Sequence, residues 1–149
     1  MREFAESDMD DLYALHASMS DAQSVMPLAD DPAEEREILR EYIRTIYGFY
    51  GFGMWAVLEK STGKLIGKIG LQPECEGVAL GYMVHGDYRR RGIAQEVCMA
   101  VCTFAKEELE INSILAWIRD DNLPSIALAK KLGFHPTEVM RQKERRYEL

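Results

Sequence analysis

The sequence has no apolar run near the roughly 18 residues of a membrane span, and its first residues show no signal-peptide pattern. Cysteine is scarce: Cys75, Cys98 and Cys102 are odd in number and lack Cys-x-x-Cys spacing. Cys98 and Cys102 lie four apart among apolar residues, which favours core packing over chemistry. We therefore predict a cytoplasmic protein in a reducing compartment, with no membrane contact and no metal site.

Basic residues are outnumbered, with 18 Lys and Arg against 25 Asp and Glu, a net charge of −7. This balance argues against a nucleic-acid partner. The sequence contains no repeats, low-complexity tracts or linkers. With 149 residues, 47% of them hydrophobic and 29% charged, we predict a single globular domain over residues 1–149, acting as a monomer or homodimer.

A local exception to the acidic balance is the cluster Arg89–Arg91. Before it, Val78–Val84 is a short apolar run that predicts a buried strand. After it, Ile93, Val97 and Val101 recur every four residues, which predicts one face of a helix. The three arginines therefore lie where a strand leads into a helix N-terminus.

Such a turn can bind an anion, because the first backbone N–H groups of a helix and its dipole both favour negative charge. Gly92 lets a ligand approach the backbone closely. The side chains of Arg89, Arg90 and Arg91 add forked donors that suit phosphate. The alternative is a solvated basic loop that only connects two elements, and spacing alone does not decide between them.

The motif Arg89-x-x-Gly92-x-Ala94 matches the (Gln/Arg)-x-x-Gly-x-(Gly/Ala) signature of the GNAT superfamily of acetyl-CoA-dependent N-acetyltransferases. It also has the family's position, between a Gly-Tyr-Met-Val strand and a long amphipathic helix. The resemblance implies that the loop binds the pyrophosphate of acetyl-CoA.

A second motif lies downstream. The segment from Asn122 through Ser125 to Phe134 resembles the family's Asn-x-x-Ser … Lys-Leu-Gly-Phe sequence. It is most similar to the branch that includes the ribosomal-protein N-terminal acetyltransferases. The resemblance is specific over Met54–Phe134 and looser outside that range.

An α/β fold with a mixed sheet is predicted, in which an antiparallel meander precedes a parallel βαβ unit. This is the arrangement that GNAT proteins show. Strands are predicted at Met54–Glu59, Leu65–Leu71, Val78–Val84 and Ile111–Ile118. The first three are joined by turns at Lys60–Gly63 and Gln72–Gly77. A helix at Asn122–Leu132 and a hairpin with arms Thr137–Met140 and Arg146–Leu149 are predicted to follow.

The N-terminal segment leaves little room for the first strand of the family. Only Arg2–Phe4 is available, so that strand is expected to be very short or missing. Ser7 predicts a helix cap before an amphipathic helix that contains Leu12 and Leu15. Met19–Asp30 is predicted to be a loop.

Asp31 and Pro32 predict a strong helix start. The apolar face of this helix is expected to include Ile38 and to continue to about Tyr47. The Gly- and aromatic-rich segment Gly48–Gly53 has two interpretations: the resemblance places it near the point where acceptor substrates enter, and packing places it at the edge of the core.

Acetyl transfer from a thioester to an amine requires that the cofactor be held, that the amine arrive neutral and that developing charge be stabilised. The resemblance implies that Arg89–Ala94 holds the pyrophosphate. Backbone groups of Met83 and Val84 are expected to bind pantetheine as an added strand does. Asn122 and Ser125 are expected to approach from the other side.

The sequence departs from the family pattern at two positions. Many relatives carry a Glu base where Ala79 stands, and others carry a Tyr acid where Ala129 stands. Ser125 is a possible stand-in that protonates the departing thiolate, although it also suits a first helical turn. His85 is interpreted as a surface residue without a catalytic role.

Three functions are compatible with these observations. The first is an N-acetyltransferase that moves an acetyl group to a primary amine by direct attack in a ternary complex. The second is a catalytically inactive acyl-CoA-binding module of the same fold. The third, a nucleic-acid binder, is disfavoured by the acidic balance. Glu74 and Glu76 could supply a base only if their turn folds inward.

Overall fold

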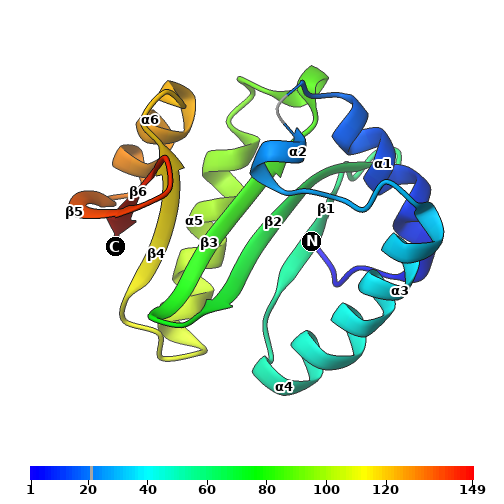
Figure 1. Cartoon of the computed structure of the whole chain (residues 1–149), viewed down its shortest axis with the longest axis horizontal. Coiled ribbons are helices and arrows are strands. Elements are labelled where there is room, and N and C mark those ends of the chain that lie inside the picture. The colour runs from blue at the N-terminus through cyan, green and yellow to red at the C-terminus, as the bar shows by residue number, and fades with distance from the viewer. Residues whose placement is uncertain (21) are drawn as a thin grey trace.

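The computed structural model describes residues 1–20 and 22–149. Within them, the strands form a six-stranded sheet in the order β1-β2-β3-β4-β6-β5 (Figure 1). The strands are β1 (Met54–Leu58), β2 (Leu65–Glu74), β3 (Gly77–Val84), β4 (Ile114–Arg119), β5 (His135–Arg141) and β6 (Glu144–Glu148). The α-helices are α1 (Met9–Ala17), α2 (Ala22–Val25), α3 (Pro32–Tyr42), α4 (Gly48–Tyr50), α5 (Ile93–Glu107) and α6 (Leu123–Lys131).

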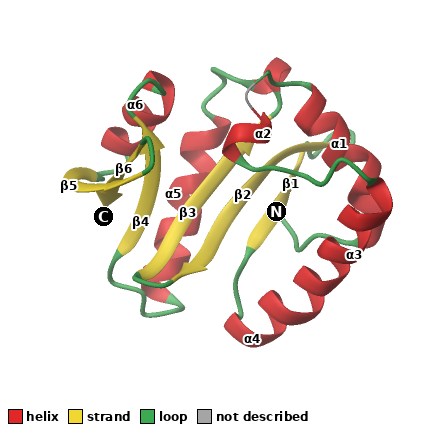
Figure 2. Cartoon of the chain, in the orientation of Figure 1, coloured by secondary structure: helices red, strands yellow, loops and turns green. Residues whose placement is uncertain are grey.

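Helices cover both faces of the sheet (Figure 2). On one face, α5 contributes Cys98, Val101 and Ala105 to the main core. On the other face, α1 and α3 bury a second apolar cluster that includes Leu15 and Leu39. None of the helices of the described residues is long and apolar enough to cross a membrane.

The predicted meander and βαβ unit are confirmed. β1, β2 and β3 pair antiparallel, and β3 pairs parallel with β4. The parallel register contains only Val78 with Ile114 and Ala79 with Leu115. Beyond these pairs the two strands diverge, as Figure 1 shows. The edge of β3 toward β4 is therefore free of strand partners over its second half.

The C-terminal hairpin is also confirmed, with longer arms than predicted. β6 pairs antiparallel with both β4 and β5, so it lies inside the sheet and β5 forms the edge. The predicted strand start at Ile111 is wrong, because β4 begins at Ile114. The Ile111 N–H donates to the carbonyl of Ala105 (2.9 Å), so this residue closes the end of α5 instead.

The first strand is reduced to one bridge between Arg2 and Ala56, in agreement with a short or missing strand. The predicted cap at Ser7 is wrong. A 3₁₀ turn precedes α1, and the buried Asp8 carboxylate accepts hydrogen bonds from the Arg2 guanidinium (2.6 and 2.7 Å) and from the Ala5 N–H (2.8 Å). The hydrogen bond from Arg2 lowers the pKa of Asp8.

Two further expectations for the N-terminal region need correction. Met19–Asp30 is not all loop, because α2 lies within it; residue 21 of that range is outside the described residues. Ile38 is 50% exposed, whereas Leu39 and Glu35 face the protein. The Glu35 carboxylate accepts from the Ala29 N–H (2.8 Å), which compensates its burial.

The helix that begins at Pro32 continues through a π-helical stretch into α4, and Gly51 ends it with φ of 70°. Phe52 then packs in the main core, while Phe49 is 81% exposed. The segment Gly48–Gly53 lines neither of the cavities described below. Its placement favours the core-edge interpretation over a role at the acceptor.

The predicted turn Gln72–Gly77 is too long. β2 extends to Glu74, which pairs with Gly77, so the turn itself consists of Cys75 and Glu76. The sequence signal was obscured by Pro73, which strands tolerate where its missing N–H is not needed for pairing.

Candidate active site

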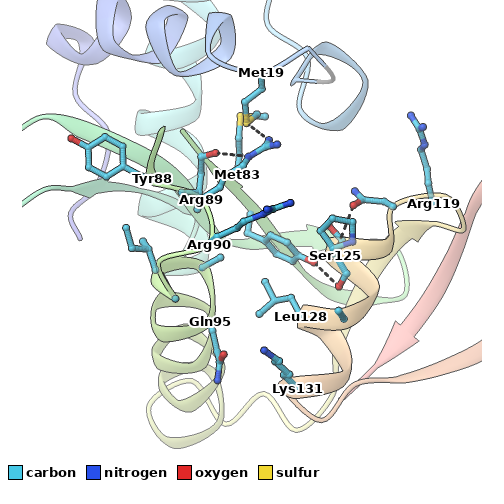
Figure 3. A pocket seen from close by; sticks show the side chains of 18 of the residues that line it. Met19, Met83, Tyr88, Arg89, Arg90, Gln95, Arg119, Ser125, Leu128 and Lys131 are labelled. Atoms are coloured by element: carbon cyan, nitrogen blue, oxygen red, sulfur yellow. Dashed lines mark hydrogen bonds between the residues drawn. The ribbon is translucent and has the colours of Figure 1, made fainter. Parts of the chain in front are cut away.

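A cavity of about 730 Å³ opens where β3 and β4 diverge, between the N-terminal end of α5 and α6 (Figure 3). It gathers the predicted cofactor residues from the end of β3, from the loop that leads into α5, and from the start of α6, about thirty residues further along the chain. Of those residues, the cavity is lined by Met83, Val84, Arg89, Arg90, Gly92, Ile93, Ala94, Asn122 and Ser125.

The loop before α5 has a backbone suited to an anion. Gly92 caps α5 with φ of 81°, and Arg90 has φ of 61°, so both residues adopt the left-handed conformation. A Cβ at Gly92 would meet no atom within 4 Å. The first-turn N–H groups of α5, at Ile93 and Ala94, have no acceptor within the helix and belong to cavity-lining residues.

The three arginines have different positions. Figure 3 shows Arg90 extending from the loop into the cavity. The Arg89 Nε donates to the carbonyl of Val84 (3.2 Å), which fixes the loop against the end of β3. Arg91 does not line the cavity: its guanidinium lies over the Tyr88 ring, 5.1 Å from the centroid. The sequence did not distinguish these roles.

The register between β2 and β3 points the backbone polar groups of Met83 and Val84 in opposite directions. The His85 N–H donates to the carbonyl of Ile66 on β2 (2.9 Å). Because the polar groups of successive residues in an antiparallel strand point to opposite sides, those of Met83 point to β2 and those of Tyr82 and Val84 point into the gap. Met83 therefore contributes its side chain to the cavity, and the expectation that its backbone is available there is wrong.

The other wall of the cavity comes from the start of α6. The Asn122 Oδ1 accepts from the Ser125 N–H (3.2 Å) and caps the helix, with Pro124 in its first turn. The Tyr82 hydroxyl donates to the Ser125 carbonyl (3.3 Å), so it joins β3 to α6 across the gap. Burial raises the pKa of Tyr82 to about 12, which keeps this hydroxyl protonated at neutral pH.

Tyr82 was not among the predicted site residues. The Gly-Tyr pair within β3 marked a strand, but the sequence gave no sign that this side chain would reach α6. Its position depends on the separation of β3 from β4, which is a property of the assembled sheet.

A second cavity, of about 300 Å³, lies toward the Met26–Pro27 segment and the β5–β6 hairpin. Its lining includes residues of β2, β3 and β4. The residues shared with the first cavity are Tyr82, Arg119, Asn122 and Ser125. The two cavities therefore adjoin at the gap between β3 and β4, where a group held in one could react with a group held in the other.

Ala79 and Ala129, which stand at the two positions where a proton-transfer group was expected from the family pattern, lie in different parts of the structure. Ala79 lines the second cavity, so a small side chain there leaves space where relatives carry a carboxylate. Ala129 is buried in the main core. Glu74 lines the second cavity but pairs with Arg141 (3.0 Å), and Glu76 pairs with Arg146. Neither glutamate presents a carboxylate that lacks a cationic partner.

The surface assignment of His85 is wrong. This residue is 9% exposed, its Nδ1 accepts from the Asp87 N–H (3.3 Å), and its ring packs edge-on against Tyr88. It lines neither cavity. β3 ends at Val84 as predicted, but the His85 N–H still donates to the Ile66 carbonyl of β2 (2.9 Å), which holds this residue against the sheet.

Cys75, Cys98 and Cys102 line neither of the two cavities. Cys98 is fully buried, and burial raises the pKa of its thiol to about 12, so it remains a thiol at neutral pH. In the described part of the chain, no group of three or more His, Cys, Asp or Glu side chains is arranged to hold a metal ion.

Residues 1–135 match the acetyltransferase (GNAT) domain family. The chain therefore belongs to the GNAT acetyltransferases, and it is an N-acetyltransferase that uses acetyl-CoA as its cosubstrate.

Similar proteins fall in the same family or share its fold. The uncharacterized protein YkkB of Bacillus subtilis is 27% identical over 146 residues, which cover 95% of this chain and 84% of YkkB. The ribosomal α-N-protein acetyltransferase RimL, solved in complex with coenzyme A, has a TM-score of 0.79 at 18% identity, covering 99% of this chain and 91% of RimL. A spermidine N-acetyltransferase chimera of Vibrio cholerae SpeG and hSSAT has a TM-score of 0.78 at 13% identity, covering 99% of this chain and 94% of the chimera.

Proposed function

We propose that this enzyme transfers the acetyl group of acetyl-CoA to a primary amine by direct attack in a ternary complex. The observation that carries the proposal is the meeting of the two cavities at the gap between β3 and β4. The larger one has the basic loop and helix N-terminus that suit a pyrophosphate. The smaller one leaves room for an amine beside the residues that line both cavities, which are Tyr82, Arg119, Asn122 and Ser125.

In this arrangement the loop Arg89–Ala94 holds the pyrophosphate through Arg90 and the first N–H groups of α5. The free edge of β3, with the N–H of Val84, receives the pantetheine amides as an added strand does. Asn122 and Ser125 form the opposite wall. Arg91 supports the loop from outside by its contact with Tyr88.

The identity of the acceptor does not follow from the fold. One protein of similar structure is named as a ribosomal-protein acetyltransferase, and another is named for spermidine. Their sequence identities to this chain, 18% and 13%, support a common fold alone. We propose a relationship to the ribosomal-protein branch from the Asn122–Phe134 motif, but that relationship does not make a ribosomal protein the acceptor.

Binding of acetyl-CoA is expected to stabilise the folded protein. At a concentration 100 times the dissociation constant, the gain is about 2.7 kcal/mol, because the ligand binds only the native state. Thermal denaturation with and without acetyl-CoA measures this gain, with free adenosine as the control. No shift of the melting temperature at millimolar acetyl-CoA contradicts the assigned cofactor cavity.

The activity itself is tested by release of free CoA during incubation with a panel of peptides, polyamines and amino acids. Release that depends on the amine supports the proposed transferase. Tight binding of acetyl-CoA without release for any amine supports the inactive acyl-CoA-binding module instead, for which Ala79 and Ala129 are the motivating features.

The rate is expected to rise with pH and to level only near the pKa of the acceptor amine. The described carboxylates that line the second cavity, Glu74 and Glu144, are both paired with Arg141, so neither is placed to deprotonate an ammonium. An α-amine of pKa about 7.7–8.0 then reacts better at neutral pH than a lysine-type amine of pKa about 10.4.

A pH–rate profile of kcat/KM for the best acceptor measures this dependence. Ser125→Ala provides the comparison: if Ser125 only protonates the thiolate, the variant loses rate modestly and keeps the same profile, since a thiol of pKa near 8.5 is already a fair leaving group. A plateau reached by about pH 6 in the parent enzyme shows that another group acts as a base.

A further inference from the structure

Both basic and acidic side chains line the second cavity, and they differ in whether they have partners of opposite charge. Lys68, Arg119 and Arg141 are its basic lining residues, and Glu74 and Glu144 are its acidic ones. Both carboxylates pair with Arg141, at 3.0 Å for Glu74 and 3.4 Å for Glu144. The carboxylates are therefore already neutralised in part by one arginine, whose guanidinium also stacks on Trp117 (4.4 Å to the centroid).

Lys68 differs from these residues. Its side chain is partly buried and reaches the cavity, but it makes no hydrogen bond or ion pair with any other described residue. Burial lowers the pKa of its ammonium, and the carboxylate of Glu35 opposes this effect only in part. An ammonium taken out of water without a partner is costly, so this position favours a bound anion.

The position of Lys68 relates it to the reacting groups. On β2 it pairs with Met83 of β3, and it lines the second cavity together with Tyr82 and Ser125, which also line the first cavity. Because Lys68, Tyr82 and Ser125 line one small cavity, a molecule whose amine lies beside Tyr82 and Ser125 can reach the Lys68 ammonium with its other end. Arg119 lines the same junction and is paired with Asp121 (2.7 Å).

We propose that the acceptor is a small amine that carries a carboxylate, and that Lys68 binds that carboxylate. The inference rests on the proposed transferase function and specifies its substrate class. A volume of about 300 Å³ suits a molecule of the size of an amino acid. A polyamine would instead place a second ammonium beside Lys68 and Arg119, where like charges repel.

The test compares matched acceptors in the parent enzyme and in two variants. Leucine, leucinamide and 3-methylbutylamine share a side chain and differ in whether a carboxylate is present, and phenylalanine, phenylalaninamide and 2-phenylethylamine form an equivalent set. For each, kcat/KM is measured by CoA release. Lys68→Met is expected to lower the ratio of acid to amide at least about tenfold, which is the effect of losing one charge-assisted contact.

The acid and its amide differ in the pKa of their amines, but this difference is the same for every variant. It therefore cancels when the acid-to-amide ratio of kcat/KM is compared between variants. Lys68→Arg is the matched control, since it keeps the positive charge and is expected to retain most of the preference. An unchanged ratio in Lys68→Met overturns the inference, as does faster turnover of spermidine or a peptide than of every carboxylate-bearing amine. Absence of CoA release with all amines is a separate result, because it contradicts the proposed transferase itself.

Discussion

Gly92→Asp is expected to weaken binding of acetyl-CoA by about 100-fold, or roughly 2.7 kcal/mol. Gly92 has φ of 81°, a conformation that costs most other residues about 1–2 kcal/mol. The new carboxylate would also lie at the N-terminus of α5, where the cofactor's pyrophosphate is proposed to bind, and the two anions would repel. Because a Cβ at Gly92 meets no atom within 4 Å, the fold itself should persist.

Calorimetric titration with acetyl-CoA measures the affinity, and circular dichroism confirms that the variant is folded. Gly92→Asn is the matched control: its amide has nearly the shape of the carboxylate, tolerates the left-handed conformation and carries no charge. It is expected to lose less than about tenfold. Equal losses in the two variants mean that strain alone explains the effect and that no anion binds at this loop.

Phe134→Ala is expected to destabilise the protein by about 3–5 kcal/mol, the usual range for removing a buried phenylalanine side chain. Phe134 is 1% exposed and packs in the main core. Its N–H donates to the Ala129 carbonyl (3.0 Å) after Gly133, which ends α6 with φ of 92°. The side chain therefore anchors the helix whose other end carries Asn122 and Ser125.

Urea denaturation measures the free energy of unfolding of this variant. Leu123→Ala, at the opposite end of α6, removes an apolar side chain that is 70% exposed and is expected to change stability by less than about 0.5 kcal/mol. A loss below about 1 kcal/mol for Phe134→Ala is incompatible with the burial observed at this position.

The corrections to the N-terminal region share one physical cause. The predicted helix cap at Ser7 and the predicted apolar face with Ile38 relied on local sequence pattern, but tertiary contacts decided where the helix begins and which residues are buried. Asp8 is held by Arg2, which lies on the segment that bridges to β1, so the start of α1 moves past Ser7. Glu35 and Leu39, one helical turn apart, form the buried face of α3, and the Ala29 N–H satisfies the Glu35 carboxylate, whereas Ile38 is half exposed.

The sequence by itself determined the meander, the βαβ unit and the position of the loop Arg89–Ala94 between β3 and α5. Each depends on local features: apolar runs, four-residue apolar periods, and turn residues between them. Strand β3 and helix α5 are adjacent in the chain, so their connection places Arg89–Ala94 without reference to distant residues.

Only the tertiary structure decided how the two cavities meet. Tyr82 reaches Ser125 because β3 and β4 separate after two paired positions, and Lys68 of β2 lines the second cavity together with Tyr82 of β3 because these two strands are neighbours in the sheet. Register and divergence are set by how all the strands pack together, including β6, which enters the sheet beside β4. A local sequence pattern cannot encode such distances between separate strands, so these residues became visible only in the folded chain.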